Sequence, residues 1–164
     1  MASGNWALFE EDFLVINQHL GKLLQNSNAR SVMLIDKTGQ LITSAGDAPT
    51  FDTTSFASLS AADFAANSQL AELIGEKEFS TLVHQGVNDS MYLSMIQQRV
   101  ILVVLFDKRT TLGLVRLRVK KTVEDISIIF VELLKKLEDP NDSSMLGGAF
   151  ASDAEDEIDN LFQD

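Results

Sequence analysis

Few residues in this chain have the types and spacing that metal or cofactor chemistry requires. His19 and His84 are its only histidines, and neither has carboxylates at the spacing of metal ligands. The chain contains no cysteine, which excludes thiolate metal sites and disulfides. The acidic run at residues 153–159, DAEDEID, lacks the central glycine and the oxygen spacing of a calcium-binding loop. The sequence therefore predicts no metal site and no cofactor.

Residues 36–39, Asp-Lys-Thr-Gly, contain an aspartate whose neighbours suggest phosphoryl transfer. The tetrapeptide resembles the phosphorylated-aspartate loop of ion-pumping ATPases. Those enzymes need many membrane helices and separate nucleotide-binding parts, and this chain has segments for neither. Lys-Thr-Gly between the apolar runs VMLI and QLIT is also what a β-hairpin turn requires. We interpret the tetrapeptide as a turn.

The chain also lacks the residues of a nucleotide hydrolase. No segment matches the phosphate-binding pattern G-x-x-x-x-G-K-[ST]. Arg99 and Arg109 flank an apolar run, and each could enter the phosphate site of another protein as an arginine finger. A solvated strand end is the simpler interpretation of both. Because no nucleophile, base and orienting group stand together, the sequence predicts a binding protein without catalytic residues.

The periodicity of apolar residues predicts one α+β domain followed by an appendage. The links between the last three strands are so short that these strands must be antiparallel neighbours. We expect an α-β-β-α-β-β-β-α order, with a five-stranded antiparallel sheet, helices on both faces and a disordered acidic C-terminal tail. The expected elements are a helix at 9–25, a hairpin at 30–46, a helix at 52–74, strands at 80–86, 90–96 and 100–107, and a helix at 111–137.

Charge divides the chain into three parts. Residues 138–164 carry nine of the 24 acidic residues and no Lys or Arg, so the net charge of −11 comes mostly from this end. We expect a domain at 1–137, a flexible linker at 138–152 around Pro140, and an acidic segment at 153–164. Six basic residues lie within 108–121, but the acidic whole disfavours nucleic acid as a partner. Neither a signal peptide nor a membrane-inserted segment is predicted, so the expected location is the cytoplasm.

The expected helix at 52–74 is rich in alanine and serine, and from 53 to 71 only Asp63 is charged. A helical wheel places the larger apolar residues on one stripe, which we expect to face the core: Phe56, Leu59, Leu70, Leu73 and Ile74. A second side gathers small residues: Ser58, Ala61, Ala62, Ala65 and Gln69. Beside them lie Ala57, Phe64, Ser68 and Ala71. Helix propensity alone favours alanine, but an almost uncharged surface of small residues is typical of an interface.

The order of elements, with the segments LIDKTGQLITSAG, DTTSFASLSA, LIGEKEF and TTLGLVRLRVKK, resembles the roadblock / dynein light chain family over nearly the whole chain. The resemblance implies a homodimer joined through the second helix and its neighbouring strand. It also implies activation of a GTP-bound, Ras-like small GTPase in bacterial cell polarity and motility, without a donated catalytic residue, and a polar position in the cell.

Carried over by position, the resemblance gives each side of the second helix a role. The GTPase would bind Ser58, Ala61, Ala62, Ala65 and Gln69. The dimer interface would contain Ala57, Phe64, Ser68 and Ala71, with Leu82 and His84 from the strand STLVHQG, which would pair with its mate.

The acidic segment has one narrow apolar edge, formed by Ile158, Leu161 and Phe162 at helical spacing. We expect it to be disordered alone and to become helical on the GTPase surface, where it would tune affinity or nucleotide exchange. A purely solubilising tail and docking on the basic strip at 116–121 remain alternatives.

Two other functions remain open for the domain. A scaffold or adaptor dimer of the same fold would not change GTP hydrolysis. A small-molecule sensor of related fold would need an apolar pocket lined by a few polar groups, and the sequence indicates no such cluster.

Overall fold

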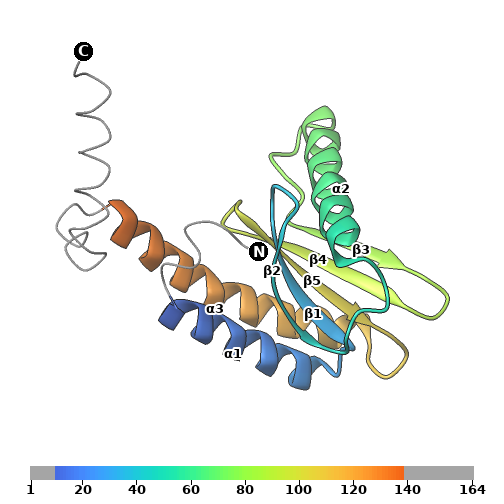
Figure 1. Ribbon diagram of the computed structural model, residues 1–164. Coiled ribbons are helices and arrows are strands. Elements are labelled where there is room, and N and C mark those ends of the chain that lie inside the picture. Colours follow the sequence, from blue (N-terminus) through green and yellow to red (C-terminus); the bar gives the residue numbers. More distant parts are fainter. Residues whose placement is uncertain (1–9, 139–164) are drawn as a thin grey trace, which may run out of the picture. The chain divides into compact units, whose positions relative to one another are not determined.

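The computed structural model describes residues 10–138. The chain divides into two compact units, Met1–Ile128 and Ile129–Asp164. The elements confirm the predicted α-β-β-α-β-β-β-α order (Figure 1). Their bounds are α1 Glu10–Ser27, β1 Ser31–Asp36, β2 Leu41–Gly46, α2 Thr53–Leu73, β3 Thr81–Gln85, β4 Ser90–Ile96, β5 Val100–Phe106 and α3 Leu112–Glu138.

The five strands form one sheet in the order β2-β1-β5-β4-β3, in which all neighbouring strands are antiparallel. The central strand β5 is buried on both faces, as its continuous apolar run predicts. The strands β2 and β3 form the two edges. Along its outer side, β3 therefore presents backbone groups that no strand within residues 10–138 pairs.

The Asp-Lys-Thr-Gly segment is the β1–β2 turn. The Asp36 carboxylate accepts hydrogen bonds from the backbone N–H and the hydroxyl of Thr38, both at 2.8 Å. Gly39 takes a positive φ of 100° and donates its N–H to the Asp36 carbonyl at 2.8 Å. The aspartate thus closes its own turn, which confirms the hairpin interpretation.

The helices cover the sheet from both sides, with α1 and the first unit's part of α3 on one face and α2 on the other (Figure 1). The apolar stripe of α1 is buried, as its spacing predicts. None of the helices within residues 10–138 is long and apolar enough to cross a membrane. The buried residues on this side of the fold include Ile16, Leu20, Leu23, Val32, Leu34, Leu102, Val104, Val115 and Val119.

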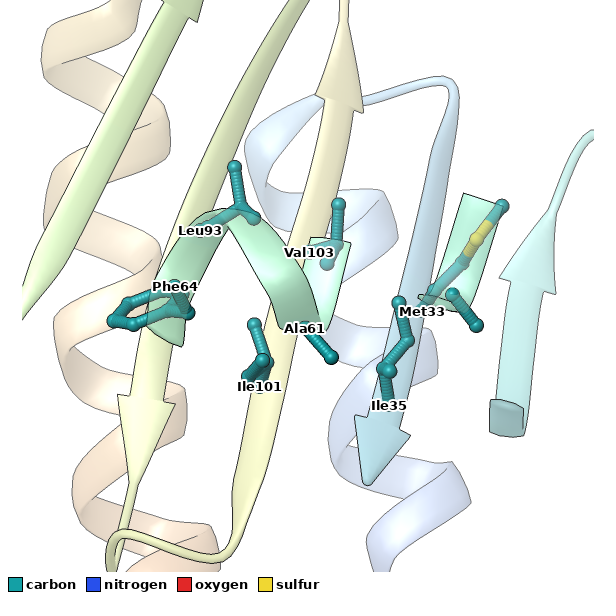
Figure 2. Close-up of a cluster of buried hydrophobic side chains, with 8 residues drawn as sticks. Met33, Ile35, Ala61, Phe64, Leu93, Ile101 and Val103 are labelled. Atoms are coloured by element: carbon teal, nitrogen blue, oxygen red, sulfur yellow. The ribbon is translucent and has the colours of Figure 1, made fainter. Parts of the chain in front are cut away.

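On the other face, α2 packs on the sheet through small residues. Figure 2 shows part of this cluster, where Ala61 and Phe64 of α2 lie over side chains of β1, β4 and β5. Ala57 is 1% exposed and Ala71 is fully buried. The cluster consists of Met33, Ile35, Ala57, Ala61, Phe64, Leu93, Ile101 and Val103.

The predicted core stripe of α2 is therefore wrong for four of its five residues. Leu59, Leu70, Leu73 and Ile74 are 70%, 53%, 82% and 70% exposed, while Phe56 is partly buried against the cluster. The reason is the closeness of the helix to the sheet. A Cβ placed on Gly39 of the β1–β2 turn would lie 3.1 Å from the Ser58 Cα of α2. Near this turn a methyl group fits beneath the helix and a leucine does not, whereas Phe64 is buried farther along the helix.

This orientation of α2 predicts how the helix responds to added volume. Ala57→Leu places three extra carbons into the close-packed layer and should lower the free energy of unfolding by about 1–3 kcal/mol. Ala62→Leu, on the exposed side of the same helix, should change it by less than about 0.5 kcal/mol. Urea denaturation of both variants measures the difference. Equal losses, or a larger loss for Ala62→Leu, would contradict the orientation.

Candidate functional site

Both ends of α2 are held by hydrogen bonds, so its exposed sides are presented on a defined helix. At the start, the Asp52 carboxylate accepts from the Ser55 hydroxyl at 2.5 Å and from the Thr54 N–H at 3.2 Å. These bonds hold the pKa of Asp52 below its ordinary value. At the end, Gly75 takes a positive φ of 85°, and Glu76 donates its N–H to the Ala71 carbonyl.

One exposed side of α2 carries the four apolar residues that were predicted to face the core, and we call them the leucine row: Leu59, Leu70, Leu73 and Ile74. Large apolar side chains with exposed fractions between 53% and 82%, gathered along one helix, form a surface that a partner could cover. The sequence contained a signal for this surface, because α2 is apolar on more than the one side that a single sheet can bury.

The leucine row lies on the side of α2 that faces the edge strand β3. Asp63 follows Leu59 by four residues, and its carboxylate pairs with the imidazole of His84 on β3, with 2.6 Å between Oδ2 and Nε2. Asn67 donates to the same carboxylate at 2.9 Å. An unpaired strand edge and an apolar helix side are therefore neighbours.

A second exposed side of α2, next to the leucine row, carries Ser58, Ala62, Ala65 and Gln69, which we call the small-residue face. All four are exposed and none is charged, so the structure brings together four of the five residues predicted to bind a GTPase. Asp63 and Ala65 are two residues apart and point to nearly opposite sides, because each residue turns a helix by about 100°.

The fifth residue of that predicted set, Ala61, belongs to the core with an exposure of 8%. Three residues predicted for the dimer interface, Ala57, Phe64 and Ala71, are likewise buried within the single chain. The close approach of α2 to the sheet uses these residues for the fold itself.

The other residues predicted for the dimer interface are accessible. Ser68 and Leu82 are partly buried, His84 is half exposed, and Leu82 and His84 lie on the α2 side of the edge strand. Ser68 donates its hydroxyl to the Phe64 carbonyl within α2 at 3.0 Å.

A hollow of about 220 Å³ lies between α2 and one end of the sheet. Its buried lining residues are apolar, and its exposed lining consists of Ala65 and three polar or charged residues, Lys37, Glu78 and Gln98. Ala65 belongs both to this lining and to the small-residue face. The sequence did not reveal the hollow, because its residues come from α2 and from several separate segments. It is lined by Lys37, Ala61, Phe64, Ala65, Ser68, Glu78, Met95, Gln98 and Ile101.

The basic side chains near the other end of the sheet are engaged within the chain. Arg30 contacts Asp89 at 3.0 Å and Asp47 at 3.5 Å. The Arg109 guanidinium lies 3.1 Å from Asp107, and the N–H groups of Arg109 hold the pKa of Asp107 below its usual range. This arrangement favours the strand-end interpretation of Arg109 over that of an arginine finger.

Among residues 10–138, no group of three histidines and carboxylates is arranged to hold a metal ion. His19 lies 3.8 Å from Asp125, and His84 pairs with Asp63. The predicted linker at 138–152 lies outside the described residues from Asp139 onwards. So does the acidic segment with Ile158, Leu161 and Phe162.

Comparisons with known proteins place the geometry in context. The sequence profile of the Roadblock/LC7 domain matches residues 15–106. The structure is similar to that of Myxococcus xanthus MglB, with 50% sequence identity, a TM-score of 0.71, and coverage of 73% of this chain and 98% of the other. A search of curated proteins gave no significant match.

Two further structures are also similar to this chain, at lower sequence identity. The gliding protein MglB of Thermus thermophilus is 31% identical with a TM-score of 0.69, over 74% of this chain and 92% of the other. A structure described as MglB with a tetrameric arrangement is 30% identical with a TM-score of 0.69, at the same coverage.

The cap of α2 gives a testable pH dependence. Because the pKa of Asp52 is lower in the folded chain than in the unfolded one, its stabilisation is present above about pH 4 and is lost as the pH falls through the folded pKa. Asp52→Asn keeps the capping geometry but does not titrate. Its melting temperature should therefore fall less than that of the wild type when the pH is lowered from about 6 to about 3. Calorimetry across this range gives the result, and two parallel curves would rule out the effect.

Proposed function

The chain belongs to the Roadblock/LC7 family, and on that premise we propose that it activates a small Ras-like GTPase in bacterial cell polarity and motility. It would act as a cytoplasmic homodimer with no active site of its own, recruited to a cell pole. The observation that carries the proposal is the division of α2 into three sides. One side faces the sheet, the second is the leucine row, and the third is the small-residue face.

The leucine row supports dimerisation. Its large side chains face water in the single chain, next to the unpaired edge of β3. A two-fold axis beside β3 would pair the two β3 edges and bring the two leucine rows together. One contact would thus pair the free backbone groups of the edge and cover the exposed apolar side chains. The pair between Asp63 and His84 holds α2 and β3 together as one surface for this purpose.

The small-residue face supports binding of the GTPase. It is turned away from Asp63 and β3, so a mate bound along β3 would leave it accessible. Small uncharged side chains let another backbone approach closely, and mobile switch loops need such a support to become ordered around the γ-phosphate. In this proposal the dimer acts by positioning the groups of the GTPase itself.

For the acidic segment we retain the expectation from its sequence. Ile158, Leu161 and Phe162 would anchor a helix on the GTPase and tune its affinity or nucleotide exchange. A scaffold that binds the GTPase without changing hydrolysis is the second candidate, because the same two surfaces would serve it equally well.

The first test addresses the dimer. Leu70→Arg should convert the protein to a monomer at micromolar concentration, because it would place an unpaired charge in the apolar contact. The substituted position is 53% exposed in the single chain, so the fold should survive. Leu117→Arg, at a leucine of α3 that is 62% exposed, is the matched control and should stay dimeric. Light scattering decides: a monomeric wild type, or a dimeric Leu70→Arg, rejects this interface.

The second test addresses the GTPase. Ala62→Arg should abolish binding to the GTP-loaded GTPase and its faster hydrolysis, while helix stability and dimer mass stay unchanged, because arginine suits an exposed helix position. Gln18→Arg, an exposed change on α1, should behave as the wild type. Multiple-turnover hydrolysis and a binding assay are measured together. Binding without acceleration would support the scaffold, and full activity of Ala62→Arg would exclude this face.

A further inference from the structure

We propose that the hollow beneath α2 is a socket for one bulky apolar side chain of the GTPase; this inference rests on the proposed function. Its volume of about 220 Å³ is below the range of roughly 300–1,000 Å³ found for pockets that enclose whole small molecules. A single side chain carried by another protein's surface is therefore the better occupant. The socket would give the small-residue face a fixed anchor point, which its flat rows of small side chains lack.

The occupant is apolar because the floor of the hollow is apolar. Phe64 and Ile101 are 2% and 1% exposed, and partly buried Met95 packs against the same cluster. Figure 2 shows Phe64 and Ile101 among the buried side chains between α2 and the sheet. The charged lining residues, Lys37 and Glu78, are exposed and form the rim. A side chain that fills the floor would leave both charges in water, so binding would carry no cost for desolvating them.

The wall of the hollow is a strained turn that the surrounding chain holds in place. Gln97 and Gln98 between β4 and β5 both have positive φ values, 51° and 56°. Asparagine and glycine are the residues that such a turn favours. The Gln98 side chain donates to the Glu78 carboxylate at 2.7 Å, and Lys37 donates its N–H to the Arg99 carbonyl at 3.0 Å. A strained turn that one side-chain bond and one backbone bond hold in place points to a functional wall.

The GTPase is a better occupant than a second copy of this chain because of where the hollow opens. Ala65, which lines it, points away from Asp63, and Asp63 marks the side of α2 that faces β3. A mate that pairs along β3 and covers the leucine row would not reach the hollow. Ala65 also belongs to the small-residue face, so the socket is continuous with the proposed GTPase surface.

The test compares a variant that fills the hollow with one that leaves α2 unchanged. Ala65→Leu places a larger side chain at the lining of the hollow, while Gln18→Leu adds an apolar side chain at an exposed position of α1 outside both the hollow and the small-residue face. The probe is the Ras-like GTPase of the same organism, loaded with a non-hydrolysable GTP analogue. Blocking the burial of one large apolar side chain should weaken binding by about ten- to a hundredfold for Ala65→Leu, whereas Gln18→Leu should bind as the wild type does.

A second variant distinguishes loss of the hollow from loss of the fold as the cause of weaker binding. Gln98→Gly relieves the positive φ, so the melting temperature should not fall, but it removes part of the wall and should also weaken binding. Equal losses for Ala65→Leu and Gln18→Leu, or wild-type affinity of either Ala65→Leu or Gln98→Gly, would overturn the socket. If Ala62→Arg still abolishes binding in that case, the proposed function stands without it. If the wild type does not bind the GTPase at all, the proposed function fails first.

Discussion

The close approach of α2 to the sheet is the constraint on which the other features of this protein depend. Because the first half of the helix lies so near the β1–β2 turn, the residues beneath it there must be small, and Ala57 and Ala61 occupy these positions. Phe64 fills the space farther along, and four other large apolar residues of the same helix have no place in the core. They face outward as the leucine row, so one packing requirement generates a surface that needs a partner.

The sheet edge and the helix ends turn that surface into a defined site. The strand β3 is an edge beside the leucine row, and the pair between Asp63 and His84 joins the two elements. Asp52 and Gly75 fix where α2 begins and ends. A second surface of small residues, continuous with the hollow, lies beside the leucine row and is turned away from β3. Two partners could thus contact different sides of one helix.

Local signals in the sequence were enough to predict the elements, and they failed for the orientation of α2. The turn at Asp36, the cap at Asp52, and the apolar run of β5 each act over a few residues, so pattern and structure agree there. Which side of α2 faces the sheet depends on the helix–sheet separation, which no local pattern encodes. Leucine was assigned to the core because leucine usually is buried. The hollow could not be predicted from the sequence either, since Gln98, Glu78 and Ala65 come together only in the folded chain.

The central claim is that α2 serves the sheet, a mate and a GTPase through separate sides, and spin labelling tests it most directly. The chain has no cysteine, so Leu70→Cys and Ala62→Cys each provide a single labelling position. The account predicts that a nitroxide at position 70 is immobilised in the protein alone. At position 62 it should be mobile alone and become immobilised only when the GTP-loaded GTPase is added. A mobile label at position 70 in the protein alone, or a label at position 62 that the GTPase does not affect, would contradict it.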